Sequence, residues 1–331
     1  MADSPYRYGK TQQFRDLIVR CRKLGIPSMT FKGTTKIHGT NCGVRFDQKG
    51  DSPNYKCTGM SRKQDLDVND KDLKHMGFAQ FVADNEGDLQ WINTGLRGDH
   101  NIGADETVVI YGEWAGKGVL QGCGIHKMET KRFFIFSACV QRGEDFIWLD
   151  IENMNAGAND RIRSMFDYGI YSIEVNFTDP EPARTVLEAI TLGIEKQCPV
   201  AEAFDCEGIG EGVVWTNIDE NGYKTMFKTK GDEHRSAGKN KLVVEIEPQL
   251  LANITEFVGY AVTVNRVQQA MDEMQATDRG FTGKVLQWVA KDIMAEESDV
   301  LEKSELTWKD VANGCNQAAR TIFFKKLDET C

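Results

Sequence analysis

The stretch "GTTKIHGTN", residues Gly33 to Asn41, places Lys36 between small polar residues and a glycine turn, with His38 two positions further on. A lysine three residues before a glycine occurs by chance about once in a chain of this length. On its own, such a lysine is an ordinary solvated cation. The segments around this stretch therefore decide both the fold and the function.

Short apolar runs separated by glycine and aspartate dominate the sequence from Met29 to about Lys230. Runs of this length that are rich in β-branched and aromatic residues are typical of β-strands. The runs are CGVRF, TVVIYGEW, RFFIFSACV, DFIWLDI, EGVVWTNI and YKTMFKTK. They predict an α+β domain with a curved, antiparallel sheet system into which a few helices are inserted.

The periodicity changes after the polar stretch GDEHRSAGKNK, residues 231–241, which we interpret as a linker. Beyond it, apolar residues recur at helical spacing, as Val285, Val289 and Ile293 do. Further stripes run through EFVGYAVTVNRVQQAMDEM and through the segment that begins at Trp308. We therefore predict two domains, an α+β domain over residues 1–240 and an all-helical domain of about three helices over 241–331.

The overall charge does not indicate a polyanionic partner. The sequence contains 40 Lys and Arg residues and 50 Asp and Glu residues, which gives a formal net charge of -10. Any nucleic acid must therefore bind a local basic surface. The nine cysteines include no CxxC pair, which favours reduced thiols. The N-terminus has no apolar signal region, and no apolar run approaches about 20 residues. We expect a soluble, cytoplasmic monomer that does not bind membranes.

Five further motifs follow Lys36 in order along the chain. They are SRKQD (61–65), YGEWAG (111–116), FFIF (133–136), EGVVW (211–215) and FKTKG (227–231). Side chains two residues apart in a strand lie on the same face of the sheet. Lys228 and Lys230 therefore share a face of their strand, and Phe134 and Phe136 share a face of theirs. A covalent nucleotidyl transferase needs a lysine nucleophile, an aromatic surface for the base, carboxylates for ribose and metal, and cations for phosphate. The ordered motifs supply each of these groups.

These motifs resemble those of the ATP-dependent ligases and mRNA-capping enzymes. They are most similar to the RNA ligase 2 family of phages and the kinetoplastid RNA-editing ligases, because KIHGTN resembles the first motif of that family in full. VTVNRV and GKVLQWVAKDI resemble its C-terminal helical domain. The resemblance implies an antiparallel-sheet nucleotidyltransferase (adenylyltransferase) domain followed by a small all-helical domain.

The resemblance also implies a reaction. An ATP-dependent RNA ligase with Mg²⁺ or Mn²⁺ transfers AMP to its own lysine, then to an RNA 5′-phosphate, and finally joins that end to a 3′-OH. The implied substrate is RNA with a nick in a duplex or in an RNA/DNA hybrid, as in RNA repair. A bacteriophage source would place the enzyme in the cytoplasm of the host cell.

The resemblance implies the following roles: Lys36 attacks the α-phosphate, Glu113 holds the ribose, Phe136 stacks on adenine, Glu211 helps place the metal, and Lys228 and Lys230 neutralise phosphate charge. Arg62 would reach the ribose and phosphate, while His38 and Asn41 would support the phosphate steps. Thr35 and Ile37 would flank the nucleotide beside the lysine. Two positions depart from the phage members: Thr35 replaces an acidic residue, and Ser137 replaces an aspartate. Both bear on nucleotide selectivity.

The nucleophile must be deprotonated before it can attack. A free lysine with a pKa near 10.4 is neutral about once in 2,500 molecules at pH 7, which corresponds to roughly 4.6 kcal/mol. We expect Lys228, Lys230 and a bound divalent ion to disfavour the ammonium form of Lys36. The same charges would stabilise the phosphate oxygens as pyrophosphate leaves.

Other functions use the same chemistry. An mRNA guanylyltransferase or a DNA ligase would carry an OB-fold, with its five short strands, after the catalytic domain. The helical periodicity after Glu245 argues against both. A catalytically inactive RNA-binding relative is the third alternative, and the retention of the lysines and glutamates argues against it.

Overall fold

The computed structural model describes residues 6–50, 54–70, 74–231, 254–304 and 306–330. Its contacts divide the chain into two compact units. The first, called the sheet unit, comprises Met1–Gln12, Ser28–Asn176 and Ile190–Lys228, and the second, called the helical unit, comprises Gln13–Pro27, Phe177–Ala189 and Thr229–Cys331. The domain limit predicted at residue 240 lies outside the described residues, as does the predicted linker beyond Gly231.

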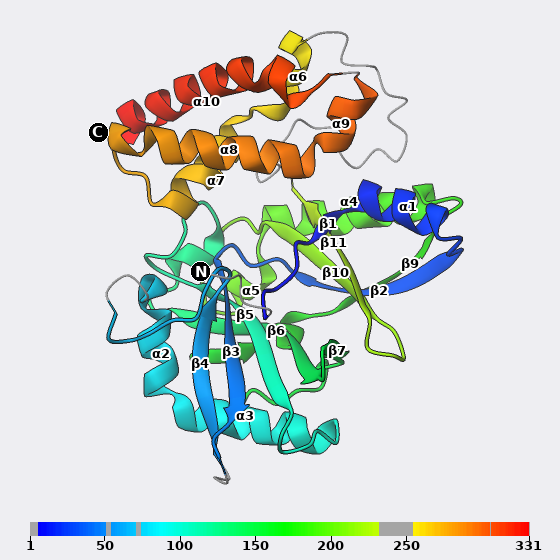
Figure 1. Ribbon diagram of the computed structural model, residues 1–331, viewed down its shortest axis with the longest axis vertical. Helices are drawn as coiled ribbons and strands as arrows, with labels where there is room; N and C mark the ends of the chain where they lie inside the picture. The colour runs from blue at the N-terminus through cyan, green and yellow to red at the C-terminus, as the bar shows by residue number, and fades with distance from the viewer. Residues whose placement is uncertain (1–5, 51–53, 71–73, 232–253, 305, 331) are drawn as a thin grey trace. The chain divides into compact units, whose positions relative to one another are not determined.

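Two β-sheets contain every strand run that the sequence predicts, and the α+β fold class is confirmed (Figure 1). The first sheet has the order β1-β11-β10-β2-β9, with bounds Gln12–Gln13, Lys224–Lys230, Gly212–Ile218, Ser28–Thr35 and Tyr171–Asn176. The second has the order β4-β3-β5-β6-β7, with bounds Tyr55–Ser61, Thr40–Gln48, Thr107–Ala115, Arg132–Arg142 and Asp145–Leu149. The ladders within this second path are antiparallel, and β8 (Ile162–Ser164) adds a parallel pairing to β6.

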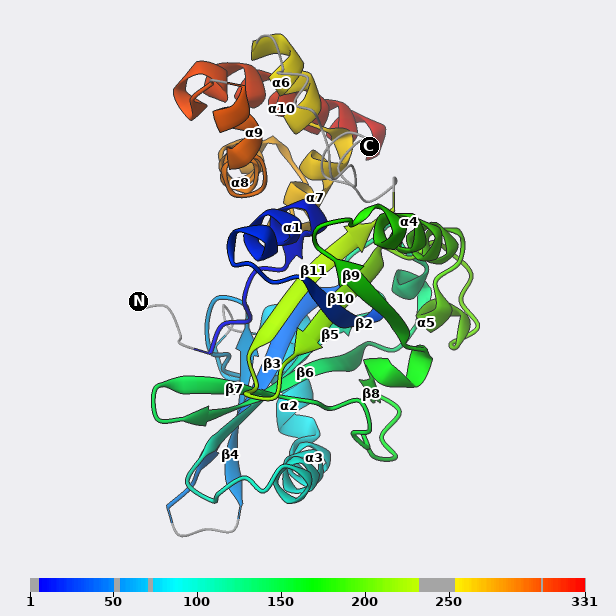
Figure 2. The ribbon, with the colours of Figure 1, turned by 90° about the vertical axis from the view of Figure 1, so that its right-hand side faces the viewer.

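One face of the second sheet is covered by α2 (Phe78–Asp84) and α3 (Glu86–Asp99) (Figure 1 and Figure 2). Side chains alternate along a strand, so Ile110 and Trp114 of β5 share one core cluster with the buried residues of these helices. Tyr111 and Glu113 must then point to the opposite face. That opposite face is where the candidate site lies.

A β-bulge interrupts the pairing of β5 with β6. Tyr111 pairs with Ser137 and Gly112 pairs with Ile135, so Phe136 is the extra residue between them. Ile135 and Ala138 both face the helix-covered core, which leaves Phe136 and Ser137 side by side on the other face. Bulges of this kind change the direction of a side chain at functional sites.

The C-terminal part of the chain is helical, as predicted. Its described helices are α6 (Ile254–Ala261), α7 (Val264–Met274), α8 (Thr282–Glu296), α9 (Ser298–Lys303) and α10 (Trp308–Thr330). The stripe predicted across EFVGYAVTVNRVQQAMDEM is wrong in one respect, because Thr263 caps α7 by accepting from the Arg266 N–H and so starts a second helix. Val264, the first residue of α7, is 47% exposed and lies outside the buried stripe.

The remaining helices are α1 (Phe14–Lys23), α4 (Glu181–Lys196) and α5 (Pro199–Glu202). In α4 the side chains of Leu187 and Ile194 are buried, whereas Val186 is exposed. None of the described helices combines the length and the apolar character that crossing a membrane requires.

Candidate functional site

Lys36 follows the last residue of β2 and is held in place by β10. Its backbone N–H donates to the carbonyl oxygen of Gly212 at 2.8 Å. Cross-strand pairs extend from Val213 with Thr35 to Thr216 with Lys32, so the ladder continues up to the lysine. This pairing fixes Lys36 beside Glu211, although 175 residues separate the two in the chain.

A single carboxylate joins two of the predicted site residues. The Nζ of Lys36 donates to Oε2 of Glu211 at 2.6 Å, and Nδ1 of His38 lies 3.3 Å from the same oxygen. Glu211 is only 2% exposed, and Lys36 is 23% exposed at its side chain. Ion pairs in such surroundings are screened little by solvent.

The pKa of Lys36 shifts in the direction opposite to the one expected. Burial alone would lower this pKa, but the charges of Glu211 and Glu113 and the hydrogen bond to Glu211 outweigh burial and raise it. In the protein alone, these carboxylates act more strongly on Lys36 than Lys228 and Lys230 do, and the effect of a bound divalent ion stays a prediction. The carboxylates around Lys36 stabilise its ammonium form, and this form must lose a proton before the lysine can act as a nucleophile.

Glu113 lies on β5 opposite Asn41 of β3, on the same side of the sheet as Tyr111. Burial, together with the charge of Glu211, raises the pKa of its carboxyl from 4.5 to about 7, against the opposing effects of Lys36 and Arg62. The structure therefore brings these charged groups into one electrostatic cluster. Arg62 itself is exposed, in the turn that follows β4.

Phe136 is half-buried at the bulge, where its ring meets that of Tyr8 edge to face with 5.1 Å between centroids. Tyr8 was not predicted as a site residue, because the N-terminal stretch carries no motif. Lys224 was also missed, although it precedes Lys228 by four residues on β11 and so faces the same side. This even spacing was the available signal.

The remaining predicted residues occupy different surroundings. Ile37 is buried in a core cluster with Ala115 and Phe134, so only its backbone can face a nucleotide. Thr35 is 3% exposed, and its Oγ1 has no hydrogen-bond partner among the described residues. Lys228 lies on β11 within the sheet unit, whereas Lys230 ends that strand beyond the limit of the unit.

The packing of the loop after Lys36 requires a glycine at position 39. A Cβ built on Gly39 would lie 2.5 Å from the carbonyl oxygen of Trp114 and 2.9 Å from the Cβ of Ala115. Real Cβ atoms do not approach a backbone this closely. The glycine thus lets the loop after Lys36 pass against β5, next to Glu113.

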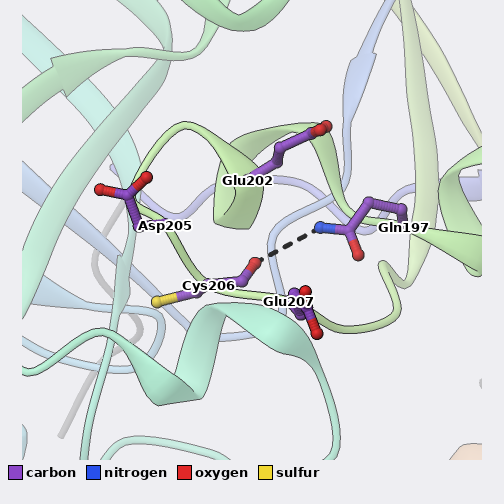
Figure 3. A pocket seen from close by; sticks show the side chains of 5 residues that line it. All are labelled: Gln197, Glu202, Asp205, Cys206 and Glu207. Atoms are coloured by element: carbon purple, nitrogen blue, oxygen red, sulfur yellow. Dashed lines mark hydrogen bonds between the residues drawn. The ribbon is translucent and has the colours of Figure 1, made fainter.

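A surface pocket of about 470 Å³ lies elsewhere in the sheet unit (Figure 3). It is lined by Gln197, Glu202, Asp205, Cys206 and Glu207, and the amide of Gln197 donates to the Cys206 carbonyl at 3.3 Å. Three carboxylates around one pocket repel phosphate. This pocket contains none of the predicted nucleotide-binding residues.

The chain matches the RNA ligase family model over residues 29–230, which is more than half of its length. It belongs to the RNA ligase family, as the motifs predicted. No curated protein sequence matches it.

Three solved structures illustrate the similarity. A Naegleria gruberi RNA ligase with PPi is 15% identical at a TM-score of 0.44, a mutant of that ligase with ATP and Mn is 12% identical at 0.45, and another mutant with AMP and Mn is 12% identical at 0.44. Each match covers 70% of this chain and 57% of the other. The chain thus spans less than two thirds of the length of these ligases.

Proposed function

We propose that this protein is an ATP-dependent RNA ligase that joins a 3′-OH to a 5′-phosphate through a lysyl-AMP intermediate on Lys36. The observation that carries the proposal is the buried pair of Lys36 with Glu211, which lies with Glu113 inside the region that matches the family. A lysine that is largely buried, faces two carboxylates and starts a glycine loop is poorly explained as a solvated surface cation.

The proposed first step uses Lys36, Glu211 and His38. The amine of Lys36 loses a proton and attacks the α-phosphorus of ATP, so that an N–P bond forms while the bond to pyrophosphate breaks. Glu211 Oε2, at 2.6 Å, is within hydrogen-bond distance to accept that proton. His38 Nδ1 at 3.3 Å keeps the same oxygen oriented.

The implied metal fits the chemistry of these residues. Mg²⁺ and Mn²⁺ prefer carboxylate and phosphate oxygens, and Mg²⁺ commonly uses only one or two protein carboxylates together with substrate phosphates. Glu211 and Glu113 supply such oxygens next to Lys36. When bound, the metal would neutralise the phosphate charge and compete with Lys36 for the carboxylates that raise its pKa.

The second and third steps act on RNA. AMP passes from Lys36 to the RNA 5′-phosphate, and the attack of the 3′-OH then releases AMP. We propose nicks in duplex RNA or RNA/DNA hybrids as the favoured substrates, on the basis of the resemblance of the helical segments to the nick-sealing members. Competition between a nicked duplex and a single strand of the same sequence tests this preference, and equal rates would contradict it.

Self-labelling tests the proposal directly. The protein is incubated with ATP or GTP carrying ³²P on the α-phosphate, with Mg²⁺ or Mn²⁺, and is then denatured and separated on a gel. We expect label from ATP that survives denaturation and is absent in Lys36→Ala, while Lys56→Ala, at an exposed position on β4, keeps it. Label from GTP alone would instead indicate a capping guanylyltransferase.

A further inference from the structure

A second lysine faces the site from β11. Lys224 and Lys228 are four residues apart on this strand, so they share a face at a separation of ~13 Å, from ~3.3 Å per residue. If Lys228 binds the phosphates, a nucleotide that lies along the strand would place its base near Lys224. This reasoning rests on the proposed function.

The surroundings of Lys224 point to the same end of the nucleotide. Its Nζ donates to Oγ of Ser137 at 3.1 Å and lies 4.0 Å from the centre of the Tyr8 ring and 2.9 Å from that of Trp148. Ser137 directly follows Phe136, and the bulge puts both on one face. The amine of Lys224 is therefore adjacent to the ring expected to stack on the base.

Keeping a lysine at this position costs stability. Burial holds the pKa of Lys224 well below its usual range, the charge of Cys139 opposes this weakly, and no carboxylate of the described residues is among the groups that act on it. A buried amine without a carboxylate partner destabilises a fold, and perturbed groups of this kind concentrate at functional sites.

We propose that Lys224 reads the nucleobase by donating a hydrogen bond from Nζ to a ring nitrogen of the purine that stacks on Phe136. The Nζ of Lys224 can donate a hydrogen bond to the base, whereas a serine hydroxyl has two lone pairs and can accept a second hydrogen bond beside the one from Lys224. Adenine presents the acceptor N7 next to the donor amino group on C6. Lys224 and Ser137 together supply the complementary donor and acceptor.

The test compares ATP with 7-deaza-ATP and 1-deaza-ATP, each lacking one ring nitrogen, in self-adenylylation by the full-length protein and by Lys224→Met. The wild type should lose roughly tenfold or more in kcat/KM with one of the two analogues. Lys224→Met should show a KM for ATP raised by a similar factor, an unchanged maximal rate of label transfer, and no further loss with either analogue. Its unfolding midpoint should be equal or higher, because methionine suits an apolar site.

Lys56→Met is the matched control, because it removes the same charge from an exposed position on β4 and should keep the wild-type preference among the three nucleotides. Ser137→Ala is a second variant, expected to stop distinguishing ATP from purine riboside triphosphate, a further analogue that lacks the 6-amino group. The inference is overturned if the wild type uses both deaza analogues as well as ATP, or if Lys224→Met retains the penalty. Absence of any label from ATP in the wild type would overturn the proposed function as well.

Discussion

Glu113 should destabilise the protein at neutral and alkaline pH, so replacing it with glutamine should stabilise the fold. The pKa of this carboxyl is raised from 4.5 to about 7, first by burial. Between these values the folded state binds more protons than the unfolded state, so the stability contributed by the group is full below about 4.5 and is lost as pH rises through 7. Glutamine resembles the protonated acid at every pH and lacks this loss.

The size of the effect follows from the shift. A difference of about 2.5 pKa units corresponds to about 3 kcal/mol, which is a large fraction of the 5–15 kcal/mol typical of folded proteins. Glu113→Gln should therefore resist urea better than the wild type at pH 8 by up to about 3 kcal/mol, and the two curves should converge towards pH 5. The same variant should label poorly with AMP, since the ionised carboxylate is lost.

Urea unfolding of both proteins between pH 5 and pH 8 measures this directly. Glu174→Gln, which changes an exposed carboxylate on β9, is the control and should follow the wild type at each pH. A Glu113→Gln variant that is less stable than the wild type at pH 8, or that keeps the wild-type pH dependence, would refute the reasoning. Either result would mean that the folded protein does not disfavour the ionised carboxylate of Glu113.

Three further changes have defined outcomes. Glu211→Gln should lower the pKa of Lys36, because the negative charge that raises it most is lost, and Lys36 should then react faster with an amine-specific reagent at fixed pH. Gly39→Ala should reduce stability and labelling, since its Cβ would clash with the β5 backbone, whereas Gly98→Ala, in open space on α3, should be neutral or stabilising by up to ~1 kcal/mol. Arg266→Met should destabilise the helical unit by about 3–5 kcal/mol.

The last of these rests on a buried ion pair. Arg266 and Glu297 are both 0% exposed at their side chains and lie 2.7 Å apart, and Asp292 adds a second contact at 2.9 Å. Removing the arginine leaves the buried carboxylate of Glu297 without its cationic partner. Arg320→Met, at an exposed position on α10, is the control, and an equal unfolding midpoint for Arg266→Met and the wild type would contradict the prediction.

Much of the sheet system was predictable because its strands carry a strong signal of their own. Successive side chains of Thr107–Ala115 point in turn to the helix-covered core and to the site. The apolar run read from the sequence is therefore a strand in the structure. Helix α3 was missed, because its segment contains three glycines that each disfavour a helix by ~1 kcal/mol. Burial of Leu89, Ile92 and Leu96 against the sheet outweighs that preference.

The site was predictable as a set of motifs but not as a set of interactions. Lys36 and Glu211 are 175 residues apart, and only the pairing of β2 with β10 brings them together. The sequence therefore suggested that lysines control the charge of Lys36, whereas the structure surrounds it with carboxylates. Lys224 was not predicted as a site residue for a related reason. Its hydrogen bond to Ser137 depends on the bulge that turns Ser137 towards it.

The most direct test of the central proposal is to locate the nucleotide on the protein. The full-length protein is incubated with ATP and Mg²⁺ or Mn²⁺ without RNA, digested under conditions that preserve phosphoramides, and mapped by mass spectrometry. We expect one AMP on the peptide that contains Lys36 and none in Lys36→Ala. AMP on a different lysine, or efficient RNA joining by Lys36→Ala, would contradict the assignment of Lys36 as the nucleophile.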